Sequence, residues 1–194
     1  MTMNTLLTGG GAPEWLRELA AARTHYEEMF GWPVTLEVEQ QVLAAPVGGV
    51  LDAVTMPAPL GEKVLADLQL MMLAGPVIAR LDDASWMFFT QPVTGPRREV
   101  PAELCHLQVH LIPRGTHVVI PTQIDSDSGL WWIKQPQPPH SLPPWPVVIG
   151  VTRRVAAQLI GSEPAVSSEP AVSSEPAVST VPGATDEHLV LIAS

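Results

Sequence analysis

Cysteine is almost absent from this chain, and long apolar segments are absent altogether. Of the 194 residues only Cys105 is a cysteine, which excludes an intrachain disulfide. The longest apolar stretch, residues 68–79, is interrupted by glycine and proline and is too short to span a bilayer. Residues 1–13 contain no basic residue and no apolar run typical of a secretory signal. We therefore expect a soluble cytoplasmic protein without a membrane segment.

Charged residues are scarce as well, at 15% of the chain. The net charge is −10, and half of it comes from residues 161–194, which hold five acidic and no basic residues. No stretch rich in lysine or arginine provides the positive surface that duplex nucleic acid requires. We therefore do not expect strong non-specific DNA binding.

The familiar catalytic motifs are missing too, since the chain has no P-loop, no Gly-x-Ser-x-Gly and no Gly-x-Gly-x-x-Gly. It does have a carboxylate, Asp52, in a segment (49–58) that predicts a short buried strand running into a turn. A two-metal nucleotidyl-transfer site needs at least two carboxylates at alternate strand positions, because a period of two puts both on one face. The alternate position holds Val54. Asp52 is therefore a candidate metal ligand without its usual second carboxylate. The alternative is a turn or cap carboxylate just before a helix, which is the commoner role of a single aspartate beside proline and glycine.

The sequence has 46% hydrophobic residues and 21 prolines, which indicates a real core built from short elements. We predict an α+β fold, with a small mixed or antiparallel sheet and about three helices. The expected helices cover residues 14–30, 60–74 and 147–160. A single helical turn is expected after Pro101, and strands are expected at 34–38, in the Asp52 segment, in a hairpin at 77–80 and 85–90, and at 107–111, 118–120 and 130–134.

Three regions of the chain differ in composition. Residues 1–12 are rich in threonine and glycine and are expected to be flexible, and residues 13–160 form the predicted domain. Residues 161–194 contain the sequence SEPAVS three times in succession, starting at Ser162. Proline in every copy and repelling acids predict a disordered acidic tail. Its end, residues 187–192, is apolar enough to add an edge strand or a short contact motif.

Two clusters have the residue types that bind nucleotides. Arg114, Thr116 and His117 lie on one expected turn, where a cation, backbone donors and an imidazole together can hold a phosphate. Lys134 follows two tryptophans, and aromatic rings near a cation can stack nucleotide bases. An ordinary solvated hairpin turn and tryptophan–proline packing explain the same two clusters.

Several segments occur in an order that is more specific than any one of them. In sequence order they are GVLDAVTMPA (49–58), LG (60–61), GPV (75–77), WMFFT (86–90), GTHVVIP (115–121), LWWI (130–133) and the proline-rich run 135–146. This order resembles the small actinobacterial proteins similar to the N-terminal domain of bifunctional DNA primase/polymerases, in the archaeo-eukaryotic primase superfamily. The resemblance covers residues 14–157.

The resemblance implies roles for particular residues. Active members of the superfamily have an acidic pair on one strand, a histidine motif that holds the nucleotide, and a further acid. Asp52 matches the first acid and His117 matches the histidine, whereas Val54 stands in place of the second acid. The only later acids near the expected position, Asp125 and Asp127, fall in an expected loop.

Three functions are compatible with these features. The first is a catalytically degenerate primase/polymerase-like protein that keeps the fold as a nucleotide- or protein-binding module, with Arg114, Thr116, His117 and Lys134 as nucleotide contacts. The second is a residual metal-dependent DNA primase/polymerase or nucleotidyltransferase, with Mg²⁺ or Mn²⁺ at Asp52. The third is an interaction or scaffold protein that acts through its acidic tail.

Overall fold

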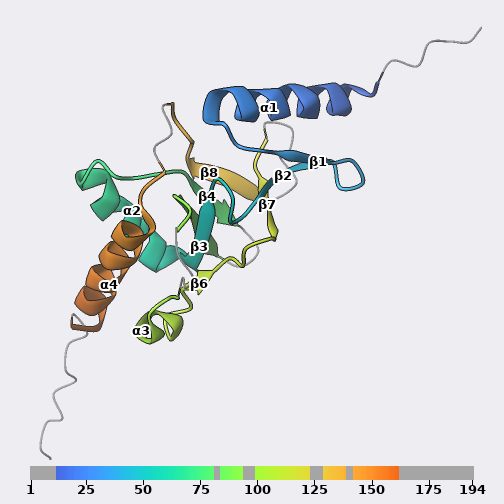
Figure 1. Cartoon of the computed structure of the whole chain (residues 1–194). Helices are drawn as coiled ribbons and strands as arrows, with labels where there is room; N and C mark the ends of the chain where they lie inside the picture. Colours follow the sequence, from blue (N-terminus) through green and yellow to red (C-terminus); the bar gives the residue numbers. More distant parts are fainter. Residues whose placement is uncertain (1–11, 81–83, 94–98, 123–128, 139–141, 162–194) are drawn as a thin grey trace, which may run out of the picture. The chain divides into compact units, whose positions relative to one another are not determined.

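The computed structural model describes residues 12–80, 84–93, 99–122, 129–138 and 142–161 (Figure 1). Over these residues the chain has an α+β fold with two antiparallel sheets and four helices, which confirms the predicted fold class. In chain order the elements are α1 (Glu14–Phe30), β1 (Thr35–Glu37), β2 (Val42–Pro46), β3 (Asp52–Pro57), α2 (Ala58–Leu70), β4 (Val77–Arg80), β5 (Ser85–Thr90), α3 (Ala102–Cys105), β6 (His110–Leu111), β7 (His117–Ile120), β8 (Leu130–Lys134) and α4 (Trp145–Gly161).

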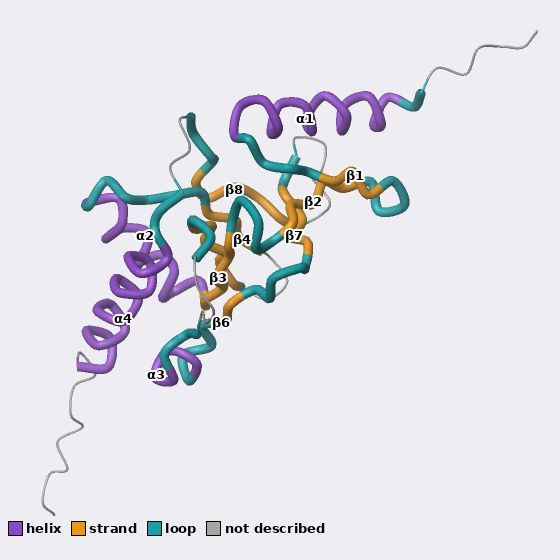
Figure 2. Tube along the Cα trace, viewed as in Figure 1, coloured by secondary structure: helices purple, strands orange, loops and turns teal. Residues whose placement is uncertain are grey.

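The described strands form a three-stranded and a five-stranded sheet (Figure 2). The smaller sheet has the order β1-β2-β7 and the larger one β6-β3-β5-β4-β8, with every neighbouring pair antiparallel. The single sheet expected from the sequence is therefore two sheets. Alternation of apolar residues shows which residues share a face, but it does not show which strand lies beside which.

The ends of the helices follow from local sequence. Helix α1 has the predicted bounds, because Glu14 suits its first turn and Gly31 closes it in the left-handed conformation, at φ 63°. Helix α2 begins two residues before the predicted position and ends at Leu70 instead of residue 74. The backbone turns at Met72, which has φ 55°, and so stops the helix before the glycine and proline that follow.

The central strand of the larger sheet, β5, sends neighbouring side chains into two separate cores. Phe88 and Phe89 are both buried and point to opposite faces, as successive residues of a strand do. The core around Phe89 lies between the larger sheet, the smaller sheet and α1. The core around Phe88 lies between the other face of the larger sheet and helices α2, α3 and α4, of which α2 and α4 run side by side (Figure 1).

Two strands differ most from the prediction. Strand β2 was not expected, because its sequence VLAAP lacks alternation; its three middle residues are all buried. The strand expected at 107–111 is only His110–Leu111. Residues 106–108 form a turn after α3 instead, which ends at Gln108 with φ 58°, where the Val109 amide donates to the Leu104 carbonyl at 3.1 Å.

The predicted flexible N-terminus (1–12) and the predicted tail (161–194) lie outside the described residues, apart from Ala12 and Gly161. Gly161 is the last residue of α4. Within the described part of the chain, no helix combines the length and the apolar character that crossing a membrane requires.

Candidate functional site

Asp52 begins β3 and its side chain is completely buried. The amide of Val93 donates to Asp52 Oδ2 at 2.9 Å, and Arg114 Nη2 lies 3.6 Å from the same oxygen. Arg114 Nη2 also donates to the Val93 carbonyl. We call Gly48, Asp52, Val93 and Arg114 the Asp52 junction, because these contacts join the start of β3 to the chain after β5 and to the β6–β7 turn.

Gly48 makes room for Arg114 in this junction. Its φ of 106° is a conformation that side-chain-bearing residues rarely adopt, and its amide donates to the Leu51 carbonyl at 2.8 Å. A Cβ atom at position 48 would lie 2.6 Å from Arg114 Cγ. The tight turn before β3 and the position of the guanidinium therefore both depend on glycine here.

The Arg114–His117 turn uses its backbone donors inside the protein. The Gly115 amide donates to the Val47 carbonyl at 2.9 Å, and the Val47 amide donates to the Thr116 carbonyl at the same distance. The Thr116 hydroxyl donates to the Pro113 carbonyl at 2.7 Å. His117 is exposed at the start of β7. The predicted phosphate site is therefore left with two side chains that reach solvent, His117 and the partly exposed guanidinium of Arg114.

Lys134 does not join this turn. It ends β8, which is three strand positions from β3 in the larger sheet, or about 14 Å at 4.8 Å for each spacing. Its side chain lines a separate small cavity with Gln69 and Gly75. Of the four predicted nucleotide contacts, the structure brings together Arg114, Thr116 and His117 only.

The carboxylate set at Asp52 does not fit a two-metal centre. Val54, at the alternate strand position, is fully buried in the core beneath α2 and α4. The described residues contain no group of three or more histidine, cysteine, aspartate or glutamate side chains that could hold a metal ion. Asp125 and Asp127 lie outside those residues. Asp52 as the ligand of a single Mg²⁺ or Mn²⁺ stays a prediction.

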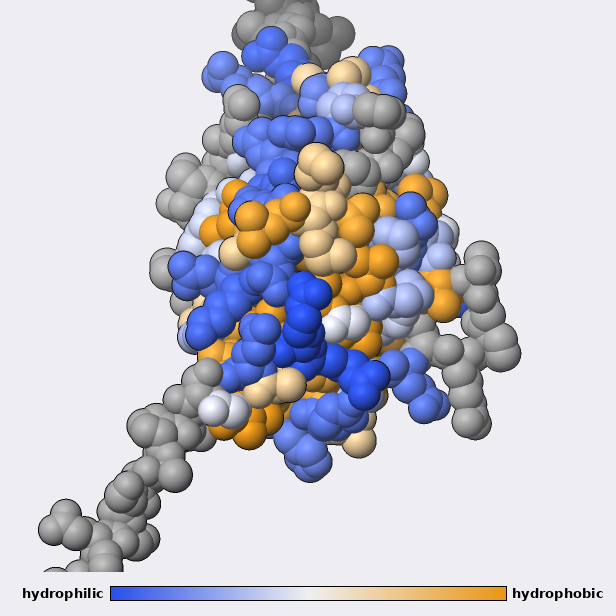
Figure 3. All heavy atoms as spheres, turned by 90° about the vertical axis from the view of Figure 1, so that its left-hand side faces the viewer, coloured by the Kyte–Doolittle hydropathy of each residue, from blue (hydrophilic) through white to orange (hydrophobic). Residues whose placement is uncertain are grey.

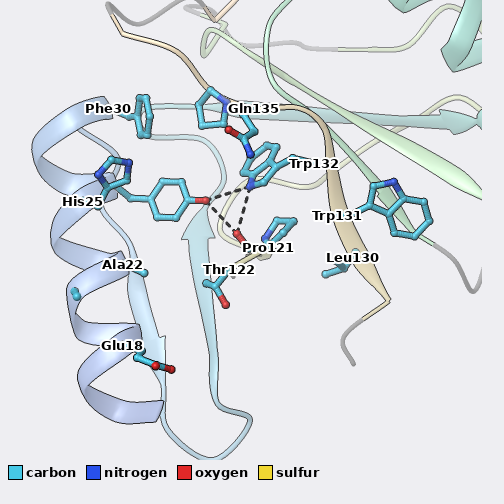
Figure 4. Close-up of a pocket in the computed structure, with 13 residues that line it drawn as sticks. Glu18, Ala22, His25, Phe30, Pro121, Thr122, Leu130, Trp131, Trp132 and Gln135 are labelled. Atoms are coloured by element: carbon cyan, nitrogen blue, oxygen red, sulfur yellow. Dashed lines mark hydrogen bonds between the residues drawn. The ribbon is translucent and has the colours of Figure 1, made fainter. Parts of the chain in front are cut away.

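A larger hollow lies between α1, the end of β7 and β8 (Figure 4). We call it the α1–β8 groove, and its volume is about 970 Å³. The residues that line it are Glu18, Ala21, Ala22, His25, Tyr26, Phe30, Pro121, Thr122, Leu130, Trp131, Trp132, Gln135 and Pro136. Sequence reasoning missed this groove, because nothing in the chain relates the aromatic residues of α1 to the tryptophans that lie about a hundred positions later.

Three hydrogen bonds hold the wall of the groove together. The Tyr26 hydroxyl donates to the Pro121 carbonyl at 3.1 Å, and Trp132 Nε1 donates to the Tyr26 oxygen at 3.2 Å and to the same carbonyl at 3.3 Å (Figure 4). Trp132 also packs against Phe89, with ring centroids 5.9 Å apart. Trp131 points away from this cluster and is 41% exposed. Trp132 is thus partly buried against the core around Phe89, while Trp131 faces outward.

Burial raises the pKa of Tyr26, and the hydrogen bond from Trp132 lowers it by a smaller amount. The unfolded chain therefore releases this proton near pH 10.0, while the folded chain keeps it to higher pH. The free energy of unfolding should be unaffected by this group below pH 10 and should fall as the pH rises above it.

Replacing Tyr26 with phenylalanine tests this assignment. We expect Tyr26→Phe to lower the free energy of unfolding by about 1 kcal/mol at neutral pH, because one buried hydrogen-bond donor and acceptor is lost. The variant should also lose the part of the alkaline destabilisation that this group causes. The chain has one tyrosine, so the absorbance of its phenolate measures this group alone. Titration of the folded protein at the ordinary pKa would contradict the assignment.

Comparison of the chain with protein-family models, with curated proteins and with solved structures finds no match.

Proposed function

We propose that this protein is a catalytically degenerate primase/polymerase-like protein that acts in the cytoplasm as a binding module. The order of segments from residue 14 to residue 157 supports the relationship, and the α+β fold is compatible with it. An exposed free cysteine, Cys105, is compatible with a reducing compartment.

The Asp52 junction is the observation that carries this proposal. A metal-binding carboxylate must present its oxygens to a cation, whereas Oδ2 of Asp52 already accepts from the Val93 amide and lies beside the Arg114 guanidinium. The position that a second carboxylate would occupy holds a buried valine, Val54. Loss of one metal ligand removes several kcal/mol of transition-state stabilisation, or on the order of a thousandfold in rate.

The α1–β8 groove favours a protein partner over a nucleotide. Its volume lies within the range of ligand sites, and aromatic rings dominate its wall. Its lining contains the carboxylate of Glu18 and the imidazole of His25 but no lysine or arginine, so it offers no permanently charged cation to a phosphate chain. Polypeptide segments with proline or aromatic side chains need no such cation.

Thermal unfolding with a panel of NTPs and dNTPs, with and without Mg²⁺ or Mn²⁺, tests the absence of a working catalytic site. We expect no metal-dependent rise in melting temperature. The assay is sensitive enough, because a ligand at a hundred times its Kd adds about 2.7 kcal/mol to the free energy of unfolding.

Two results of this panel would be decisive in different ways. A metal-dependent shift that Asp52→Asn abolishes, together with template-directed dNTP incorporation, would overturn the proposal. A metal-independent shift that His117→Ala removes would make the ligand a nucleotide and would leave the lack of catalysis in place.

A further inference from the structure

The end of α2 exposes four consecutive apolar residues. Leu70 is 84% exposed, Met71 42%, Met72 91% and Leu73 38%. Figure 3 shows hydrophobic side chains gathered on the face of the molecule where α2 and α4 lie. Soluble domains avoid such consecutive exposed apolar residues unless they bind something. We call residues 70–73 the α2 patch.

The backbone of the patch holds Met72 outward in an unfavourable conformation. Met72 has φ 55°, and the amide of Leu73 donates to the Leu68 carbonyl at 2.9 Å, which closes the helix end. Glycine usually occupies this left-handed position, because it has no Cβ to strain. The chain therefore keeps an exposed methionine where glycine would be more stable, and an exposed contact residue accounts for that choice.

A cation lies next to the patch. Gln69 and Met72 share a cavity of about 240 Å³ with Lys134, Gln135 and Gln137. No carboxylate among the described residues pairs with Lys134. By contrast Arg154, on α4, is bound to Asp67 at 2.9 Å. The apolar patch is thus bordered by amide groups and by a lysine that is available for a carboxylate.

We propose that the α2 patch binds a polypeptide segment in which carboxylates stand next to a short apolar run. The apolar run of the bound segment packs on residues 70–73, where the side chains of the two methionines adapt to its shape. A carboxylate of the segment pairs with Lys134. The chain itself contains such a sequence, DEHLVLI at 186–192, outside the described residues. This binding does not depend on the function proposed above and would hold for an active enzyme as well.

Methionine oxidation by dilute peroxide, followed by peptide mass mapping, tests this proposal. The probe is a synthetic peptide with the sequence of residues 186–192, and its control has both acids replaced by amides. The full chain is tested unchanged and as the double variant Leu189→Asp/Leu191→Asp. In the variant, the chain's own copy of the sequence does not compete with the probe. Met29 on α1 is the internal control, because its exposed fraction of 43% is close to the 42% of Met71 on the patch.

We expect the probe to slow oxidation of Met71 and Met72 about fivefold and to leave Met29 unchanged. The amide control should protect less. Lys134→Gln and Met72→Gly should each weaken binding of the probe about fivefold, and Met72→Gly should keep or raise the melting temperature, so a lost fold cannot explain its effect.

Three results would overturn the proposal. One is equal protection of Met29. Another is full affinity for the probe in Lys134→Gln and Met72→Gly. The last is protection that rises with protein concentration and needs no probe, since it would make a second copy of the chain the occupant.

Discussion

Replacing Gly48 with alanine is expected to lower the free energy of unfolding by about 3 kcal/mol, whereas Gly49→Ala should change it by less than about 0.5 kcal/mol. The two glycines are neighbours in the same turn, but only Gly48 has a positive φ. A Cβ atom at position 48 would also lie 2.9 Å from Arg114 Cβ, which cannot move away without its backbone. A Cβ at position 49 meets nothing within 4 Å.

Urea unfolding of the two variants measures this difference, provided that the free energy of unfolding falls with urea concentration at the same slope for both. Gly49→Ala is the matched control, because it removes the same glycine flexibility from the unfolded chain. Equal losses for the two variants would mean that the turn before β3 does not rely on the left-handed conformation of Gly48.

Arg114→Met is expected to lower the free energy of unfolding by about 2–3 kcal/mol, since it removes the guanidinium that lies beside the buried Asp52 carboxylate. The expected loss is below that of a fully buried ion pair, because Arg114 is 43% exposed and water screens it. The variant also removes the donor to the Val93 carbonyl. Methionine keeps most of the apolar volume of the arginine stem, so the loss measures the guanidinium.

A double-mutant cycle with Asp52→Asn isolates the charge interaction. Asparagine keeps an oxygen that accepts from the Val93 amide but has no charge. Arg114→Met should then cost less than about 1 kcal/mol in the Asp52→Asn background, which gives a coupling of 1 kcal/mol or more. The same loss in both backgrounds would show that the ion pair contributes nothing and would weaken the structural role proposed for Asp52.

Much of the fold could be predicted from the sequence, because its signals are local. The period of apolar residues in α1, with Glu14 at its start and Gly31 at its end, fixes both ends of that helix. The β4–β5 hairpin likewise follows from two short, largely apolar segments with aspartates between them. Strand β2 could not be found in this way, since VLAAP is buried on both sides and its pairing with β7 depends on residues more than seventy positions away.

The candidate site was predictable only in part, because its contacts join residues that are far apart in the sequence. The sequence shows that Asp52 has no second carboxylate beside it, since Val54 is two positions away. It does not show that Asp52 is buried or that Arg114 reaches it from the β6–β7 turn. The α1–β8 groove is formed by α1 and β8, two segments that come together only when both sheets are in place.

The pairing of distant strands has a consequence for how the protein acquires its structure. The smaller sheet needs β7 beside β2, and the larger one needs β8 beside β4. Long-range pairing of this kind slows folding, because a large loop must close before the contacts form. During synthesis neither sheet can be completed until residues 117–134 have left the ribosome. Until then β2 and β4 each have an unpaired edge. A chaperone would protect the chain most at this stage of synthesis.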